Sequence, residues 1–223
     1  MCGRFTITLP INELILRYII EDSKIINYKP RYNVAPMQNV LAVISGKMGQ
    51  RLGELRWGLV PEWAKDQSMG SKMINARAES LADKPSFRQL LASRRCIIPA
   101  DGFYEWKQEV ERKQPYRIMM QDGSIFSFAG LYDIWSDPNG NKLATCTIIT
   151  TEPNSLMAGI HNRMPAILRP DDEAMWLNRD NTDVHFLKSL LKPYDATKMR
   201  AYPVSSAVGN VRNDSRELIE EIK

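Results

Sequence analysis

The chain has 223 residues, of which 43% are hydrophobic and 25% are charged. This length suits one large domain or two small ones, and the composition is ordinary for a soluble globular protein with a core of normal size. The formal net charge of +4 permits a polyanionic partner without requiring one, because ordinary solvated lysines give the same excess. No apolar run approaches the length of a membrane span, which argues against a helical membrane protein.

The first predicted element is a helix over residues 11–20, where apolar residues recur with a helical period. Two strands follow, at 40–44 and 52–57, joined by a hairpin-like connection. Residues 79–93 then predict a second helix, which Pro85 interrupts or delays.

Strands dominate the middle of the chain. The apolar and β-branched runs predict them at 96–99, 103–107, 116–120, 125–129 and 143–150, with a turn at 121–123. A further strand is predicted at 164–168, then helices at 171–177 and 183–191, and a last strand at 198–204.

Strands fill the centre of the sequence and helices lie at its margins, without the alternation that βαβ units require. We therefore expect a single α+β domain over residues 1–223. Its core should be a largely antiparallel, barrel-like sheet with peripheral helices.

The three cysteines, Cys2, Cys96 and Cys146, have the spacing of neither a disulfide framework nor a metal site. Cys96 and Cys146 lie in predicted strands and should be small buried residues. With only two histidines in the chain, no zinc site and no cofactor are expected. Arg4 and polar neighbours interrupt any signal-peptide pattern, so a reducing, cytoplasmic location is expected, with nucleoid association when the protein is bound to DNA.

Cys2 directly follows Met1, and a residue this small allows removal of the initiator methionine. The mature chain would then begin with an amine and a thiol on adjacent carbons. Such a pair captures aldehydes, because the amine forms an imine and the thiol closes a five-membered ring. It can also act as an N-terminal nucleophile with its own base. A Cys2 without chemical function is the alternative.

Four segments place titratable or amide side chains among apolar neighbours, where burial is costly unless the polar groups are paired. They are therefore either internal polar networks or parts of a site. They span residues 2–5, 73–79, 99–107 and 160–165.

Glu105 and His161 are the candidate proton-transfer groups. Strand alternation puts Glu105 on the face of Phe103, and aromatic surroundings raise a carboxyl pKa as a general acid requires. An exposed edge-strand glutamate, or one bound to an arginine, is the alternative. His161 lies in a predicted loop and suits proton transfer, although a lone histidine can be structural. His185 lies in a helical run and is expected at the surface or in helix packing.

Arginine and tryptophan side chains are the candidate nucleic-acid contacts. Arg4, Arg77 and Arg163 can each hold a phosphate with a bidentate fork, or can simply be solvated. Asn75 can orient a sugar or carbonyl oxygen. Exposed tryptophans can stack on unpaired bases. Three tryptophans are candidates for such stacking, and packing in the core is the alternative for each: Trp57, Trp63 and Trp106.

Together these segments resemble the SRAP family, the SOS-response-associated peptidases, which includes abasic-site processing proteins. The motifs occur in family order over nearly the whole chain: Met1–Phe5, Arg31–Pro36, Trp57–Pro61, Asn75–Glu79, Pro99–Trp106, His161–Pro165 and Pro203–Val211.

The resemblance implies a protein that binds abasic sites in single-stranded DNA, often beside a duplex junction, and links to the open sugar as a thiazolidine. It implies that Cys2 is the nucleophile and that Asn75, Glu105 and His161 line the site. DNA contacts are implied for Arg4, Arg77 and Arg163, and more loosely for Trp63. Trp106 is expected to join them as a stacking residue. No membrane and no obligate protein partner are expected.

Two other functions are compatible with the residues. An N-terminal-nucleophile peptidase, acting on its own leader, would combine Cys2 with His161 and with Asn75 or Glu105. A non-covalent reader of damaged single-stranded DNA would leave Cys2 passive.

Overall fold

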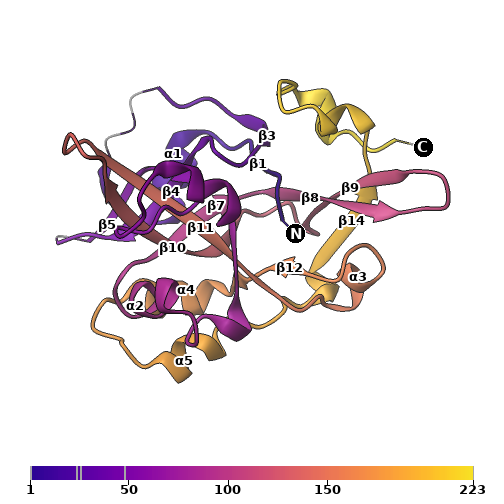
Figure 1. The fold of residues 1–223 in the computed structure, drawn as a ribbon. Coiled ribbons are helices and arrows are strands. Elements are labelled where there is room, and N and C mark those ends of the chain that lie inside the picture. The colour runs from indigo at the N-terminus through magenta and orange to yellow at the C-terminus, as the bar shows by residue number, and fades with distance from the viewer. Residues whose placement is uncertain (1, 24, 26, 48, 223) are drawn as a thin grey trace.

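A computed structural model describes residues 2–23, 25, 27–47 and 49–222 (Figure 1). Met1, whose removal is expected, and Met48, in the predicted connection between the first two strands, lie outside the described residues. Two sheets form the centre of the molecule, and short helices lie around them.

The larger sheet contains a closed barrel of five strands, in the spatial order β11-β10-β7-β4-β5, with β5 pairing back onto β11. Four of the five pairings are antiparallel, and β5 with β11 is parallel. A ring with an odd number of strands cannot alternate direction throughout, so one parallel pairing is unavoidable. The strands are β4 (Asn39–Ser45), β5 (Gln50–Trp57), β7 (Arg95–Ala100), β10 (Phe126–Ser136) and β11 (Lys142–Thr151).

Four short strands attach to this barrel. β2 (Ile20–Ser23) runs parallel to β5, and β13 (Ile167–Leu168) pairs with β10. β6 (Asn75–Arg77) and β12 (Met164–Pro165) both pair with the last residues of β11. The end of β11 therefore gathers segments that are far apart in the sequence.

The smaller sheet is antiparallel, in the order β14-β9-β8-β1-β3. Phe5 in β1 pairs with Phe103 in β8, which draws the start of the chain onto the central strand of this sheet. The strands are β1 (Phe5–Ile7), β3 (Arg31–Val34), β8 (Gly102–Gln108), β9 (Lys113–Met120) and β14 (Met199–Pro203).

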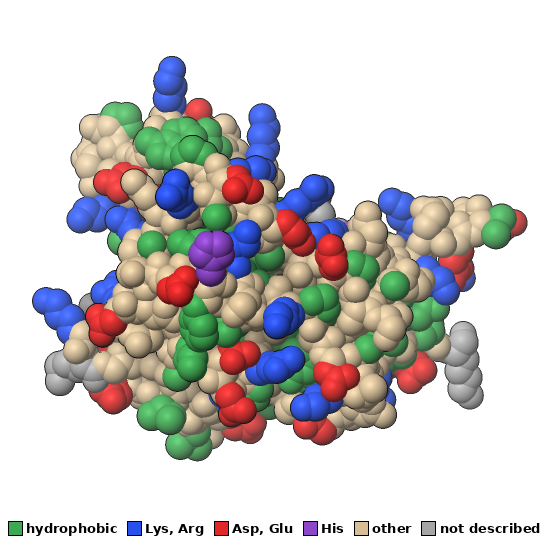
Figure 2. Space-filling view, turned by 90° about the horizontal axis from the view of Figure 1, so that it is seen from below, with side chains coloured by type: hydrophobic (Ala, Val, Ile, Leu, Met, Phe, Trp, Pro, Cys, Tyr) green, Lys and Arg blue, Asp and Glu red, His purple; other side chains and the backbone are tan. Residues whose placement is uncertain are grey.

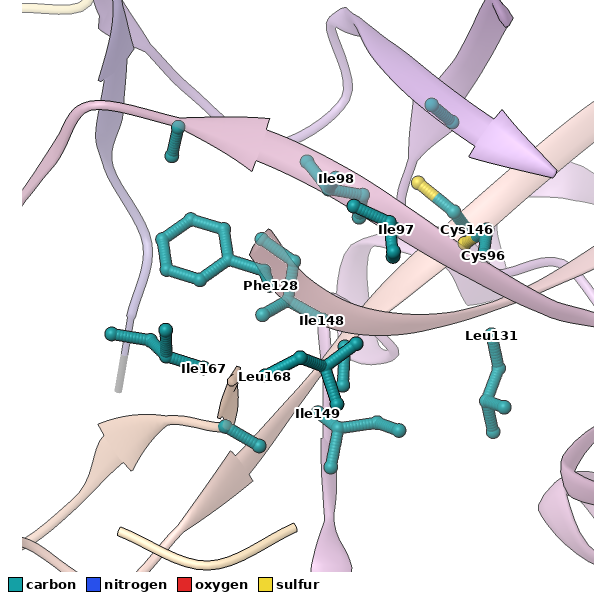
Figure 3. Packing of buried hydrophobic residues seen from close by; sticks show 14 of the residues in the cluster. Cys96, Ile97, Ile98, Phe128, Leu131, Cys146, Ile148, Ile149, Ile167 and Leu168 are labelled. Atoms are coloured by element: carbon teal, nitrogen blue, oxygen red, sulfur yellow. The ribbon is translucent and has the colours of Figure 1, made fainter. Parts of the chain in front are cut away.

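One hydrophobic cluster joins the two sheets. Phe5 and Phe103, from the smaller sheet, stack edge-on against Phe128 in the barrel. Figure 3 shows Cys96 and Cys146 side by side in this packing, and neither is exposed to solvent. Both strand cysteines are buried, as predicted.

Three helices begin at sequence signals for a helix start, although the helix predicted over 79–93 begins only at Pro85 and α3 was not predicted. Pro85 and Pro170 occupy first-turn positions, where a missing N–H costs nothing, and the Asp183 carboxylate accepts two backbone N–H bonds at the start of α5. Figure 1 shows α2, α4 and α5 gathered on one side of the barrel. The helices are α1 (Ile11–Arg17), α2 (Pro85–Ser93), α3 (Ser155–Ala158), α4 (Pro170–Leu177) and α5 (Val184–Ser189).

The predicted fold class is confirmed: the protein is an α+β barrel with mostly antiparallel strands. The helix predicted over 11–20 ends at Arg17, because Ile20 begins β2. The strand predicted over 164–168 is two short strands that pair with different partners. The turn at 121–123 connects the two sheets, with Gly123 at φ +76°, and does not form a hairpin.

Candidate functional site

The strand register places Cys2 beside Glu105. Phe5 pairs with Phe103, and the Tyr104 N–H donates to the Arg4 carbonyl at 3.0 Å. Extending this antiparallel register by two residues brings Gly3 opposite Glu105, next to Cys2. Cys2 is completely buried and Glu105 is 2% exposed, so the two groups share a desolvated position.

Alternation along β8 explains why Glu105 points inward. Phe103 belongs to the main core, whereas Tyr104 packs on the other face, in a second cluster with Tyr202 and Leu218. Burial excludes the exposed edge-strand alternative for Glu105. Desolvation disfavours the carboxylate and raises the pKa of Glu105 to about 7. A substantial fraction of this acid is therefore protonated at neutral pH.

The Cys2 thiol is held in its neutral form. Burial raises its pKa far above the ordinary value, and the nearby charge of Glu105 raises it further. Because the thiolate is the reactive nucleophile of a cysteine peptidase, this environment is unfavourable for direct attack by sulfur.

Asp101 clamps β1 in this position. Its carboxylate accepts hydrogen bonds from the Thr6 hydroxyl at 2.5 Å, the Thr8 hydroxyl at 2.5 Å and the Thr8 N–H at 2.6 Å. The buried guanidinium of Arg117 lies 3.4 Å from the same carboxylate. These contacts fix β1, which begins three residues after Cys2, against the Ala100–Gly102 corner.

A cleft of about 660 Å³ lies at the end of β11 and contains three of the predicted residues, Asn75, Arg77 and Arg163. The Asn75 amide donates to the Ile148 carbonyl at 3.3 Å. Its oxygen is buried and accepts no hydrogen bond from the described residues. Arg77 is exposed at the same cleft.

Arg163 is already paired in this cleft. Its two terminal nitrogens donate to the two carboxylate oxygens of Glu79 at 2.8 and 3.0 Å. One of them also donates to the Thr150 carbonyl at 2.7 Å. Such a parallel fork is the strongest common form of charge-assisted hydrogen bonding.

His161 is half-buried beside Arg163. His161 Nδ1 lies 3.0 Å from the Arg163 N–H, from which it can accept, and 3.2 Å from the Arg163 carbonyl oxygen, to which it can donate in the other tautomer. Burial lowers the pKa of His161, so the imidazole is mostly neutral near pH 7. His185 is exposed on α5, and a surface position was one of the two expected for it.

Trp57 connects the two groups of predicted residues. Its ring lies 5.4 Å from that of Phe5, and its Nε1 donates to the Ile74 carbonyl at 2.8 Å, directly before Asn75. Trp57 is completely buried and belongs to the core, so it cannot serve as a stacking platform.

Arg4 and Trp106 lie toward the C-terminal segment. Arg4 donates to the Asn33 side chain at 2.9 Å and to the carbonyls of Val208 and Gly209 at 2.6 and 3.1 Å. Its guanidinium lies 5.9 Å from the centre of the Trp106 ring. These contacts do not bring Arg4 together with Arg77 and Arg163.

Trp63 is 64% exposed and lines a second groove, of about 550 Å³, together with Pro85 and Arg94. It does not line the cleft that contains Asn75. Its exposure suits a stacking contact, and its assignment to DNA stays a prediction.

Sequence reasoning missed two residues of this region. Glu79 and Asp101 both lie in the segments that had been singled out, but neither received a role. Their partners, Arg163 and Thr6, are remote in the sequence, so nothing local indicated the contacts.

Among the described residues, no group of three or more His, Cys, Asp or Glu side chains is placed to hold a metal ion. No helix in the described ranges has the length and apolar character needed to cross a membrane. Figure 2 shows basic and acidic side chains interspersed on the face with α5, so the positive charge forms no continuous band there.

The fold and the buried cysteine–carboxyl pair define a class: α+β barrel proteins with a candidate active site at the second residue. The family model for SOS response associated peptidase (SRAP) matches residues 1–211, and the chain belongs to this family.

Three relatives illustrate the range of the family. "Abasic site processing protein YoqW" of Bacillus subtilis is 55% identical, with 99% of both chains covered. "Abasic site processing protein HMCES" of Gallus gallus is 34% identical over 88% of this chain and 67% of its own length. The crystal structure of a Bacteroides thetaiotaomicron protein, 30% identical, superimposes with a TM-score of 0.90 over the full length of both chains.

Proposed function

We propose that this protein captures abasic sites in single-stranded DNA by a covalent bond to Cys2 after removal of Met1. The observation that carries the proposal is the position of Cys2 beside Glu105, a buried carboxyl with a pKa of about 7. The names of the relatives support DNA with abasic sites as the substrate.

The amine of Cys2 is proposed to react first. A free α-amine has a pKa of about 7.7–8.0, so part of it is neutral at cytoplasmic pH. It adds to the aldehyde carbon C1′ of the ring-opened sugar, and loss of water gives an imine. Protonated Glu105 is suited to donate to the ring oxygen during opening and to the departing hydroxyl.

The thiol then closes the ring. Sulfur adds to the imine carbon and the thiol proton goes to nitrogen, so the thiazolidine forms with the overall loss of one water. A buried neutral thiol suffices here, because sulfur and imine are held in one molecule at an effective concentration of up to about 10⁵ M or more. His161 is proposed to carry the proton or to assist the reverse reaction.

The cleft at the end of β11 is proposed to hold the strand. Asn75 presents a buried oxygen without a hydrogen-bond donor in the described part of the chain, which suits a sugar hydroxyl or the nascent amine. Arg77 and Arg163 are proposed to contact phosphates. An abasic nucleotide needs no base to be flipped out, so a tight site excludes normal nucleotides.

The peptidase alternative is less favoured by these groups. A raised thiol pKa and a histidine with a lowered pKa disfavour a thiolate–imidazolium pair. The non-covalent reader differs only in that Cys2 takes no part.

One experiment separates the three functions. The protein is incubated with a single-stranded oligonucleotide containing one abasic site and analysed on a denaturing gel, with Cys2→Ala and an undamaged oligonucleotide as controls. We expect a slower species with the abasic strand only, absent with Cys2→Ala. Binding in a native gel without this species would favour the reader, and cleavage of casein or of the chain's own leader without it would favour the peptidase.

A further inference from the structure

Glu79 binds the Arg163 guanidinium in the way that a phosphate would. Its two carboxylate oxygens accept hydrogen bonds from the two terminal nitrogens of Arg163 at 2.8 and 3.0 Å, the geometry in which arginine also binds a phosphate. The Arg163 side chain is 15% exposed and that of Glu79 is 46% exposed. The carboxylate is thus the outer, displaceable member of the pair.

Arg163 does not depend on Glu79 for its orientation. The Thr150 carbonyl and hydroxyl accept from the same nitrogen at 2.7 and 3.3 Å, and these atoms belong to the barrel strand β11. If Glu79 left, the guanidinium would stay in the cleft with its fork available. Arg163 also lowers the pKa of Glu79, so the carboxylate stays charged at neutral pH.

Charge in the cleft favours an anion. Four cationic side chains, Lys72, Arg77, Lys84 and Arg163, face two carboxylates, Glu79 and Glu152. Only Glu79 is paired with Arg163 through both oxygens. A phosphodiester that enters at Arg163 must break this pair and leave Glu79 charged beside the strand.

We propose that Glu79 is a specificity-determining residue that competes with DNA phosphate for Arg163 and keeps the affinity for undamaged single strands low. The inference rests on the proposed function in taking a single strand as the ligand. An abasic strand meets the same competition, but covalent capture retains it. An undamaged strand forms no covalent bond and therefore dissociates.

The test measures non-covalent binding in the Cys2→Ala background, with a fluorescent undamaged oligonucleotide at several salt concentrations. Glu79→Gln keeps the shape and removes the charge, and we expect affinity to rise about five-fold. The slope of log affinity against log salt should steepen by up to roughly 0.7, the contribution of one phosphate contact, because Arg163 can then neutralise a phosphate without giving up a carboxylate. Glu152→Gln, which removes the other carboxylate of the cleft, is the matched control and should change both quantities less.

An unchanged or weaker affinity of Glu79→Gln, or an equal gain in Glu152→Gln, would overturn the inference. Glu79→Asp provides a second variant, whose shorter side chain weakens the pairing with Arg163 and should raise the affinity by less than Glu79→Gln does. A loss of affinity in this variant would also contradict the inference. Thermal melting confirms that each variant is folded.

A competition assay links the binding result to function. With Cys2 intact, a large excess of undamaged strand should slow adduct formation by Glu79→Gln several-fold more than adduct formation by the wild type. An equal effect on both proteins would overturn the specificity role. If the wild type forms no adduct at all, the covalent proposal fails, while the binding measurement still decides the role of Glu79.

Discussion

The barrel interior and the segment that leads into β1 both bury a cysteine completely, and they differ in what surrounds the sulfur. Cys96 and Cys146 lie in the barrel among apolar side chains, and a Cβ on Gly130 would lie only 2.9 Å from the Cys96 sulfur. Cys2 lies beside Glu105. Burial raises the thiol pKa in both places, so burial alone does not indicate chemistry. The titratable neighbour distinguishes the two regions.

The largest expected effect tests this contrast directly. Cys2→Ala should abolish adduct formation with an abasic strand. Cys146→Ala should keep the adduct rate and instead lower the free energy of unfolding by about 1 kcal/mol, because it leaves a small cavity in the core. Denaturing gels and urea unfolding measure the two properties. Loss of the adduct in a folded Cys146→Ala protein would mean that the barrel thiol takes part.

Removing the proton from the carboxyl site should have the next largest effect. Glu105→Gln should slow adduct formation about 100-fold, because the general acid is lost, while affinity for an undamaged strand stays within a few-fold. The neutral fraction of the amine rises with pH while the protonated fraction of Glu105, whose pKa is about 7, falls, so the wild-type rate should pass through a maximum between about pH 7 and 8 and decline above it. Glu105→Gln should lack this decline. Loss of binding together with rate would make Glu105 structural.

The same substitution sharpens the comparison through stability. The pKa of Glu105 is raised from 4.5 to about 7 in the folded protein, so the folded chain holds this proton more tightly than the unfolded chain. The wild type should therefore lose stability between pH 4.5 and 7, by about 1–3 kcal/mol, as the buried carboxyl becomes charged. Glu105→Gln should not show this loss of stability between pH 4.5 and 7. Urea titrations at both ends of this pH range measure the difference.

Loosening the clamp on β1 should have an intermediate effect. Asp101→Asn replaces a buried acceptor of three hydrogen bonds and should lower the free energy of unfolding by about 3 kcal/mol. Adduct formation should slow about ten-fold, because Cys2 is held less firmly beside Glu105. Thr8→Val, which removes one of the three bonds, should give a smaller change in both. A destabilised variant with a wild-type rate would separate the clamp from the chemistry.

The smallest effect is expected at the cleft. Arg77→Ala should weaken binding of an undamaged single strand a few-fold and flatten its salt dependence by roughly 0.7, the contribution of one phosphate contact. Arg88→Ala, an exposed arginine on α2 that does not line the cleft, is the control. An unchanged salt slope would remove Arg77 from the phosphate contacts.

Local patterns in the sequence were sufficient for much of the fold. Proline at the first turn located α2 and α4, and the Asp183 cap located α5. Alternation in β8 predicted that Glu105 shares a face with Phe103, and the structure shows that this face is buried. These features depend on residues a few positions apart, which is the range over which helical and strand periods operate.

Short strands and the closure of the barrel were not predictable in this way. β1, β3 and β6 have three or four residues each, too few to show a period, and they exist because remote strands pair with them. The parallel pairing of β5 with β11 follows from the ring having five strands, a property of the whole sheet.

By itself the sequence determined the family motifs, the position of Cys2 directly after Met1 and the residues available to a site. Tertiary structure decided how those residues are paired: Arg4 with the C-terminal carbonyls, and Arg163 with Glu79, 84 positions away. The physical reason is that a charged side chain takes whichever partner the strand register brings within about 3 Å, and register between distant strands is set by the packing of the entire core.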